Sequence, residues 1–327
     1  MKRTIVAAVT GLCAAGFVIG NLSTAAAEWP NDRPIHLIVA FGAGGGTDIA
    51  ARIVADPLSK LLNQSIVVEN KPGGGGTIGT EYVARADKDG YTASMISTGH
   101  TVGAAMLKAA SRYDAVKDFA PVAVVANSTF VVVANKDFAA NDVKGLIALA
   151  KASPGKLNFA SVGVGSTQHI AGELLVQKAG IDVKHIPYRG SPALVAALLA
   201  NQVDYAVETF QAVQGQVLAG KLKLLAVGST TRSPNAPDVP TVAESGVPGY
   251  NVSGWYGWVY PAGVPQAIID KTNAALKKVL AEPEIREKLS KIGAVASMST
   301  PAEFHAILAD DVAKWIAVRD KAGLTAK

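Results

Sequence analysis

The chain has a single cysteine, Cys13, which lies in an apolar stretch near the N-terminus. The rest of the chain therefore has no disulfide, no thiolate nucleophile and no cysteine-based metal site. Such a chain must be stabilised by its hydrophobic core, and roughly 300 residues supply a core of sufficient size. The same length suits two domains.

Charge is also scarce. Charged residues make up 17% of the chain, which is typical of buried parallel strands and packed helices. There are 31 basic and 26 acidic residues, and without Lys2 and Arg3 the basic residues number 29, a net charge of about +3. The basic residues are scattered, with no basic stripe and no interleaved aromatic residues, so we expect no nucleic-acid partner.

The only long apolar run lies at the N-terminus. Lys2 and Arg3 precede an apolar stretch, residues 4–20, and the three alanines at 25–27 provide small residues for cleavage. This pattern predicts a secretory signal peptide over residues 1–27, with a retained membrane anchor as the alternative. No later run is long and apolar enough to span a bilayer.

Strands and helices alternate in two separate parts of the chain, which predicts βαβ units and parallel sheets. In the first part we expect strands at 35–41, 65–69 and 92–97 and helices at 48–62 and 77–86. In the second part we expect helices at 143–152, 168–178, 193–200 and 211–219 and strands at 157–160, 183–186, 203–207 and 222–227. A helical tail follows at 265–280, 284–291 and 301–322, with a short strand near 294–297.

Two extended stretches connect these parts. Residues 122–126 and 130–134 are rich in β-branched residues, and residues 250–259 are aromatic and extended. With two crossings the chain forms two α/β lobes, residues 28–127 plus 251–327 and residues 128–250. In open α/β sheets, ligands bind beyond the carboxyl ends of the strands, so the cleft between the lobes is the expected site. Hinge closure around a ligand is expected as well.

Two Gly-rich turns share one local design. Residues 35–50 and residues 157–171 each read as a short apolar strand, a Gly-rich turn, a threonine and a helix. Glycines allow close approach of the backbone, and the helix start offers free N–H groups, so each turn is a candidate anion site. Thr47 and Thr167 are candidate hydroxyl donors, or helix caps, or both. Asp48 either caps its helix or binds a cationic group of the ligand.

The sequence contains no complete motif for a nucleotide cofactor or a metal ion. Gly74–Gly79 matches G-x-G-x-x-G, but the next strand ends at Ser97 and Thr98 without the acidic residue that a dinucleotide site needs. No Walker phosphate loop occurs. The histidines are dispersed along the chain, so we expect neither a metal nor a cofactor; they are His36, His100, His169, His185 and His305.

A nucleophilic enzyme is the main alternative to a binding protein. The G-x-S-x-G elbow is missing, although Ser161 and Ser166 lie in the second Gly-rich turn and His169 follows three residues after Ser166. No base is identifiable from order or spacing. Further along the chain, Tyr188 and Glu208 follow strands and are candidates for the cleft. Arg189 fits an anion partner and a surface salt bridge equally well. For Trp255 and Trp258, hinge packing is favoured over stacking on a ligand.

Five motifs occur in an order that resembles the Bug family, the extracytoplasmic receptors of tripartite tricarboxylate transporters. They are Phe41-x-x-Gly-Gly-Gly-Thr-Asp-x-x-Ala-Arg52, Glu69-Asn-Lys-x-Gly-Gly-Gly-Gly-x-x-Gly79, Ser161-x-Gly-x-Gly-Ser-Thr-x-His-x-Ala-Gly172, Pro187-Tyr-Arg-Gly190 and Asp238-Val-Pro-Thr-x-x-Glu-x-Gly246. The resemblance covers essentially the whole chain after the signal. Ala43 and Glu208 stand where relatives often carry Pro and Asp, so the exact ligand stays open.

The resemblance implies the two-lobed periplasmic-binding-protein fold and a periplasmic receptor without catalysis. It implies that the cleft captures a small carboxylate, such as a dicarboxylate, tricarboxylate or aromatic carboxylate, for the membrane subunits of a transporter. The chain is expected to be a monomer without cofactor or metal. The expected ligand-binding residues are Phe41, Gly45, Gly46, Thr47, Asp48, Ser97, Thr98, Ser161, Gly165, Ser166, Thr167, Gln168, Tyr188 and Glu208.

Overall fold

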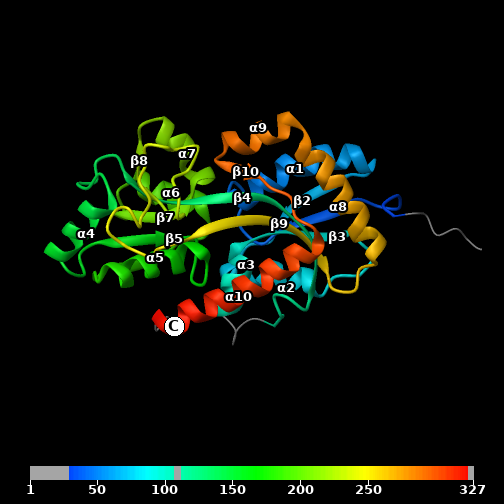
Figure 1. The fold of residues 1–327 in the computed structure, drawn as a ribbon, viewed down its shortest axis with the longest axis horizontal. Helices are drawn as coiled ribbons and strands as arrows, with labels where there is room; N and C mark the ends of the chain where they lie inside the picture. Colours follow the sequence, from blue (N-terminus) through cyan, green and yellow to red (C-terminus); the bar gives the residue numbers. More distant parts are fainter. Residues whose placement is uncertain (1–28, 107–111, 323–327) are drawn as a thin grey trace, which may run out of the picture.

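One long strand, β4 (Phe119–Asn135), runs through both halves of the computed structural model, which describes residues 29–106 and 112–322 (Figure 1). Residues 119–129 of β4 pair antiparallel with β9 (Ser253–Pro261). Residues 130–135 pair with β7 (Tyr205–Thr209) on one side and β8 (Leu222–Val227) on the other. The expected signal peptide lies outside the described residues.

The two groups of strands share one design. In the first group the order is β2-β1-β3-β9-β4, with β10 also pairing with β4, and β1, β2 and β3 run parallel. In the second group β6, β5 and β7 run parallel beside β4. The remaining strands are β1 (Ile35–Val39), β2 (Ile66–Asn70), β3 (Thr92–Ser97), β5 (Asn158–Ser161), β6 (Lys184–Pro187) and β10 (Ala294–Ala296).

Helices cover both groups (Figure 1). The first group carries α1 (Gly46–Leu62), η1 (Gly74–Gly76), α2 (Thr77–Ala84), α3 (Thr98–Met106), α8 (Gln266–Ala281), α9 (Pro283–Lys291) and α10 (Pro301–Ala322). The second group carries α4 (Val143–Ala152), α5 (Thr167–Ala179), α6 (Ser191–Leu199) and α7 (Phe210–Leu218). Within the described residues, no helix combines the length and the hydropathy needed to cross a membrane.

Three local details differ from the expectation. The runs 122–126 and 130–134 are parts of one strand, because the polar residues between them still pair with β9 and β10. Pro57 lies inside α1 and does not end it, since the apolar face on both sides of it, Val54 and Leu58, is fully buried. Helix α3 was not expected, because Gly99 and Gly103 are poor helix formers.

Packing explains why α3 forms. Its side chains are almost all buried, and it lies against α10. Val102, Ala105 and Trp315 belong to the hydrophobic cluster of the second group of strands. Helices α3 and α10 thus connect the two halves, and tertiary burial overrides a weak local propensity. The lobe boundaries at residues 127/128 and 250/251 stay a prediction.

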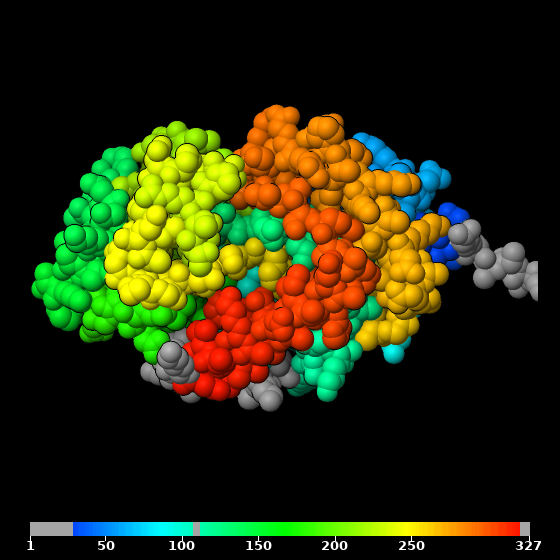
Figure 2. All heavy atoms as spheres, in the orientation of Figure 1, coloured from blue at the N-terminus to red at the C-terminus, as the bar shows by residue number. Residues whose placement is uncertain are grey.

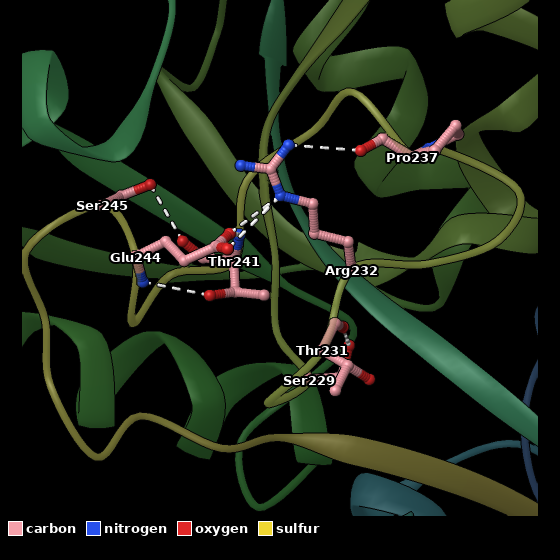
Figure 3. A network of polar contacts seen from close by, with 7 residues as sticks. All are labelled: Ser229, Thr231, Arg232, Pro237, Thr241, Glu244 and Ser245. Carbon is pink, nitrogen blue, oxygen red and sulfur yellow. Dashed lines mark hydrogen bonds and ion pairs between the residues drawn. The ribbon is translucent and has the colours of Figure 1, made fainter.

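The loop before β9 is ordered by a reciprocal pair of hydrogen bonds (Figure 3). Thr241 N donates to Glu244 Oε2 at 2.7 Å, and Glu244 N donates to Thr241 Oγ1 at 3.0 Å. Arg232 Nε donates to the same carboxylate at 3.1 Å, and its Nη1 donates to Pro237 O at 3.3 Å. The backbone hydrogen bond from Thr241 is the main cause that lowers the pKa of Glu244. This network holds the loop at 232–249 in place.

Candidate functional site

The first Gly-rich turn is fixed from behind by Asp48. This buried side chain accepts hydrogen bonds from Gly44 N at 2.9 Å, Arg52 Nε at 3.0 Å and Asn70 Nδ2 at 3.0 Å. Burial raises the pKa of Asp48, but the hydrogen bonds from Arg52, Gly44 and Asn70 outweigh burial and keep the pKa below its ordinary value. Asp48 therefore supports the turn and does not line the cavity described below.

The helix that follows this turn begins without a side-chain cap. Gly45 is the N-cap residue of α1, and no side chain accepts from the first N–H groups. Uncapped N–H groups at a helix start carry the positive end of the helix dipole and favour an anion. Helices α6 and α7, which follow Gly190 and Thr209, also begin without a side-chain cap.

The second Gly-rich turn, in contrast, satisfies its own polar groups. Ser166 Oγ accepts from His169 N at 3.2 Å and donates to Gly163 O at 2.7 Å, so it caps α5. Gly165 N donates to His169 Nδ1 at 3.2 Å. Ser161 Oγ accepts from Gly163 N at 3.1 Å and lies 2.7 Å from His185 Nε2. Ser161 and Ser166 are both fully buried.

A small cavity of about 30 Å³ lies between the two turns. Its volume suits about one or two water molecules. On the face shown in Figure 2, atoms of β4 and β9 form the floor of a hollow between the yellow residues and the orange to red C-terminal residues. The cavity is lined by Phe41, Gly42, Gly45, Gly46, Thr47, Ser97, Thr98, Gly99, Ser128, Phe130, Val162, Thr167, Gln168, Gly190, Ser191, Thr209, Trp255 and Tyr256.

The lobes are in close contact around this cavity. A Cβ atom on Gly46 would come within 2.9 Å of Thr209 Oγ1 on β7 in the other group of strands. A Cβ atom on Gly45 would lie 3.5 Å from Ser191 Oγ. The start of α1 therefore faces the starts of α6 and α7 across the cleft, and the structure is in a closed arrangement.

A buried polar atom at the cavity, Thr167 Oγ1, has no hydrogen-bond partner among the described residues. Leaving such an atom unpaired costs about 1–3 kcal/mol, and native structures keep few such atoms without a reason. Burial raises the pKa of Tyr256 above its ordinary value, so this phenol keeps its proton and is a donor.

Glu208 lies at the end of β7, one layer behind the cavity wall. Its Oε1 accepts from Gln168 Nε2 at 2.9 Å, Thr209 N at 2.6 Å and Thr209 Oγ1 at 3.1 Å. Burial raises the pKa of this fully buried carboxyl group, which favours the neutral acid, although the hydrogen bonds from Gln168 and Thr209 act in the opposite direction. Gln168 and Thr209 line the cavity, so Glu208 orients two of its wall residues.

The structure divides the fourteen expected site residues into three sets. Eight line the cavity: Phe41, Gly45, Gly46, Thr47, Ser97, Thr98, Thr167 and Gln168. Tyr188 lines a larger neighbouring hollow of about 770 Å³, whose walls also include Phe41, Gly42, Val162 and Gly190 of the cavity. Five lie outside the lining of either space: Asp48, Ser161, Gly165, Ser166 and Glu208.

Some cavity residues had escaped the sequence analysis. Gly190 and Ser191 follow β6 at its carboxyl end, so the rule that locates ligands beyond parallel strands would have found them. Ser128 and Phe130 lie in the middle of β4, where no sequence signal marks a site. Trp255 and Trp258 differ in their positions. Trp255 lines the cavity, whereas Trp258 is fully buried in the hydrophobic core.

The histidines are less dispersed than their spacing in the sequence suggests. The rings of His169 and His185 stack with centroids 4.1 Å apart. His169 Nε2 lies 3.7 Å from Glu173 Oε1, one helical turn further along α5. His100 is separate from these and is buried, with Nε2 at 2.8 Å from Ala115 O.

Comparison with known proteins gives the family. Residues 50–324 match the family described as the tripartite tricarboxylate transporter family receptor. The solved structure of the periplasmic binding protein BugD is 34% identical, with 90% of this chain and 99% of that chain covered and a TM-score of 0.86.

Two similar structures carry ligands. Rpa4515 from R. palustris, solved with adipate, is 31% identical, with 91% of this chain and 99% of that chain covered and a TM-score of 0.88. MatC (Rpa3494) from Rhodopseudomonas palustris, solved with bound malate, is 30% identical, with 88% of this chain and 99% of that chain covered and a TM-score of 0.84. The resemblance found in the sequence and the two-lobed α/β fold are both confirmed. The chain belongs to the family of tripartite tricarboxylate transporter receptors, the Bug-type periplasmic solute-binding proteins.

Proposed function

We propose that this protein captures a small organic carboxylate in the cavity between the two lobes. The observation that carries the proposal is the convergence of two uncapped helix starts, those of α1 and α6, on one cavity. Backbone N–H groups bind a carboxylate without a charged side chain. The adipate and malate bound by the two similar proteins support a dicarboxylate as the ligand class.

Side chains complete the proposed anion site. Thr167 Oγ1 is a buried hydroxyl group without a partner among the described residues, and both Thr167 and Tyr256 line the cavity. In the proposed complex each hydroxyl donates a hydrogen bond to a ligand carboxylate, which for Thr167 removes the cost of an unpaired group. Asp48, Ser161, Gly165, Ser166 and Glu208 act from behind, because they hold the turns and Gln168 in place.

Ligand entry requires the lobes to open. A cavity of about 30 Å³ is too small for a dicarboxylate, and ligand pockets are usually about 300–1,000 Å³. We infer that the open form joins this cavity to the neighbouring hollow, since Phe41, Gly42, Val162 and Gly190 line both. Closure around the carboxylate then creates a surface that a membrane subunit of the transporter recognises.

An exported serine hydrolase remains the second candidate because Ser161 Oγ lies 2.7 Å from His185 Nε2. This geometry resembles a nucleophile with its base. Ser161 is fully buried, however, and it lines neither the cavity nor the neighbouring hollow. We therefore propose a receptor without catalytic activity. Ester hydrolysis that disappears in Ser161→Ala or Ser166→Ala would establish the enzyme instead.

The proposal places the protein in the periplasm as a monomer, after removal of residues 1–27. The family supports the periplasm, since BugD is a periplasmic binding protein. N-terminal sequencing of protein from a periplasmic extract tests both statements, with Glu28 as the expected first residue. Protein that stays in the membrane fraction with residues 1–27 attached would contradict the expected cleavage. Light scattering measures the molar mass in solution and so tests the monomer.

The direct test is calorimetry with adipate, malate, citrate and benzoate on the wild-type protein and on Thr167→Val. We expect one of these acids to bind, and the variant to bind it about 10–100-fold more weakly, because a hydrogen bond to a charged group contributes about 1.5–3 kcal/mol. Thr92→Val, on β3 and outside the cavity lining, is the matched control and should keep wild-type affinity. Equal affinity in all three proteins would exclude Thr167 from the anion site.

A further inference from the structure

A second cluster of ligating side chains lies beside the carboxylate cavity. His169, Glu173 and His185 each offer one ligand atom, and these three atoms all lie within 4.8 Å of one another. His169 and Glu173 occupy positions i and i+4 on α5, so they share one face of the helix. His185 comes from β6, and its ring stacks on that of His169.

The roles described so far do not account for all three residues of this cluster. They do not bind the anion, and only His169 and His185 contact the second Gly-rich turn. Glu173 has one close contact among the described residues, at 3.7 Å from His169 Nε2, and its side chain is 28% exposed. A half-buried glutamate beside two imidazole rings has no role in binding an anion, since its charge would repel the anion. The donor atoms of this cluster therefore favour a cation as the ligand.

We propose that His169, Glu173 and His185 form a binding site for a divalent transition-metal ion of the zinc class. Two imidazole nitrogens and one carboxylate oxygen are the donor set that Zn²⁺, Co²⁺ and Ni²⁺ accept, whereas Mg²⁺ and Ca²⁺ prefer oxygen donors alone. Three protein ligands leave a position for water. The partial exposure of all three residues gives the ion a path from solvent.

Each ring also makes one hydrogen bond that bears on ligation. Ser161 Oγ lies 2.7 Å from His185 Nε2, so in the proposed site His185 binds the ion through Nδ1. A metal-bound histidine commonly makes such a hydrogen bond with its other nitrogen. In His169, Nδ1 accepts from Gly165 N at 3.2 Å. When a metal ion binds His169 Nε2, the neutral ring carries its proton on Nδ1. Nδ1 can then no longer accept the hydrogen bond from Gly165 N.

This last step links the metal to the second Gly-rich turn. Gly165 lies two residues before Thr167, which lines the cavity and whose buried Oγ1 has no hydrogen-bond partner among the described residues. The ion would therefore shift the turn that holds a proposed ligand donor. The metal site itself does not depend on the proposed carboxylate, so zinc binding and carboxylate binding are measured separately.

The test is titration of the untagged, chelator-treated protein with Zn²⁺ by calorimetry and with Co²⁺ by visible absorption. We expect one ion per chain and a cobalt spectrum with nitrogen and oxygen ligands. Glu173→Gln and His185→Gln should each weaken Zn²⁺ binding at least about tenfold, since even indirect contacts to a metal site contribute that much. His305→Gln, on the exposed surface of α10, is the matched control and should bind as the wild type does.

Loss of folding is separated from loss of a ligand by thermal unfolding of each variant without metal. Glu173→Gln keeps the size of the side chain and breaks no other contact among the described residues, so its unfolding midpoint should match that of the wild type. Zinc should raise the wild-type midpoint and leave that of Glu173→Gln unchanged. Absence of stoichiometric binding, or equal affinity in the wild type and both ligand variants, would overturn the proposal.

Discussion

The two Gly-rich turns look alike in sequence, yet they work in opposite ways. The first turn leaves the start of α1 uncapped, and a charged carboxylate, Asp48, holds it from behind. The second turn caps its own helix with Ser166, and the carboxyl group beside it, Glu208, is buried with a raised pKa. Shared sequence design therefore does not imply shared function. In the proposed site the first turn offers backbone N–H groups to the carboxylate, whereas the second offers the Thr167 hydroxyl.

The first way to break this comparison is Asp48→Ala, for which we expect the largest effect. The substitution removes the acceptor of hydrogen bonds from Gly44 N, Arg52 Nε and Asn70 Nδ2, and a hydrogen bond to a charged group contributes about 1.5–3 kcal/mol. The free energy of unfolding should fall by about 2–3 kcal/mol, measured by denaturant titration. Ser166→Ala is the matched change in the second turn, where loss of a helix cap costs about 1 kcal/mol.

The sign of the pH dependence follows from the lowered pKa of Asp48. The stabilisation is present above the unfolded value of the pKa and is lost as the pH falls through the folded value. The difference in stability between wild type and Asp48→Ala should therefore shrink in acid. An unfolding free energy that is equally low for Ser166→Ala and Asp48→Ala at neutral pH would remove the contrast between the two turns.

The second prediction concerns closure. In Gly46→Ala the new methyl group would come within 2.9 Å of Thr209 Oγ1 in the other lobe, and within 2.2 Å of the buried Tyr256 Oη in its own lobe. Overpacking of this kind costs about 1–3 kcal/mol, so carboxylate affinity in calorimetry should fall about 10–100-fold. Gly215→Ala in α7 meets no atom within 4 Å and is the control. Unchanged affinity in Gly46→Ala would mean that the closed contact is not part of the bound state.

The third and smallest effect is expected for Glu208→Gln. Because the folded pKa of Glu208 is raised, the folded state binds the proton more tightly, and the wild type loses stability as the pH rises above the unfolded value. The amide removes this titration and still accepts at Oε1. The variant should therefore be more stable than the wild type at neutral pH, with no difference at pH 4.

Thermal unfolding at a series of pH values measures this difference. Asp48 and Glu208 should then show pH dependences of opposite sign, which sharpens the comparison between a charged and a neutral carboxyl group. A Glu208→Gln protein that is less stable than the wild type at every pH would show that Glu208 is needed as a carboxylate.

The sequence predicted most strands, helices and the family, because hydrophobic periodicity and the Gly-rich motifs are local. It did not predict α3, where Gly99 and Gly103 oppose a helix that burial against α10 enforces. It treated the histidines as separate, since the contact of His169 with His185 depends on how β6 pairs with β5. Ser128 and Tyr256 were missed for the same reason, because strand pairing alone brings them to the cavity.

The position of β9 has a consequence for the order of folding. Strand β9 lies between β3 and β4 in the first group of strands, and it pairs with both. Residues 35–135 therefore cannot complete their sheet until residues 253–261 have been synthesised. Pairings so distant in sequence slow folding. The first half of the chain must wait for the last quarter, so a newly made chain stays incompletely folded until its synthesis is nearly finished.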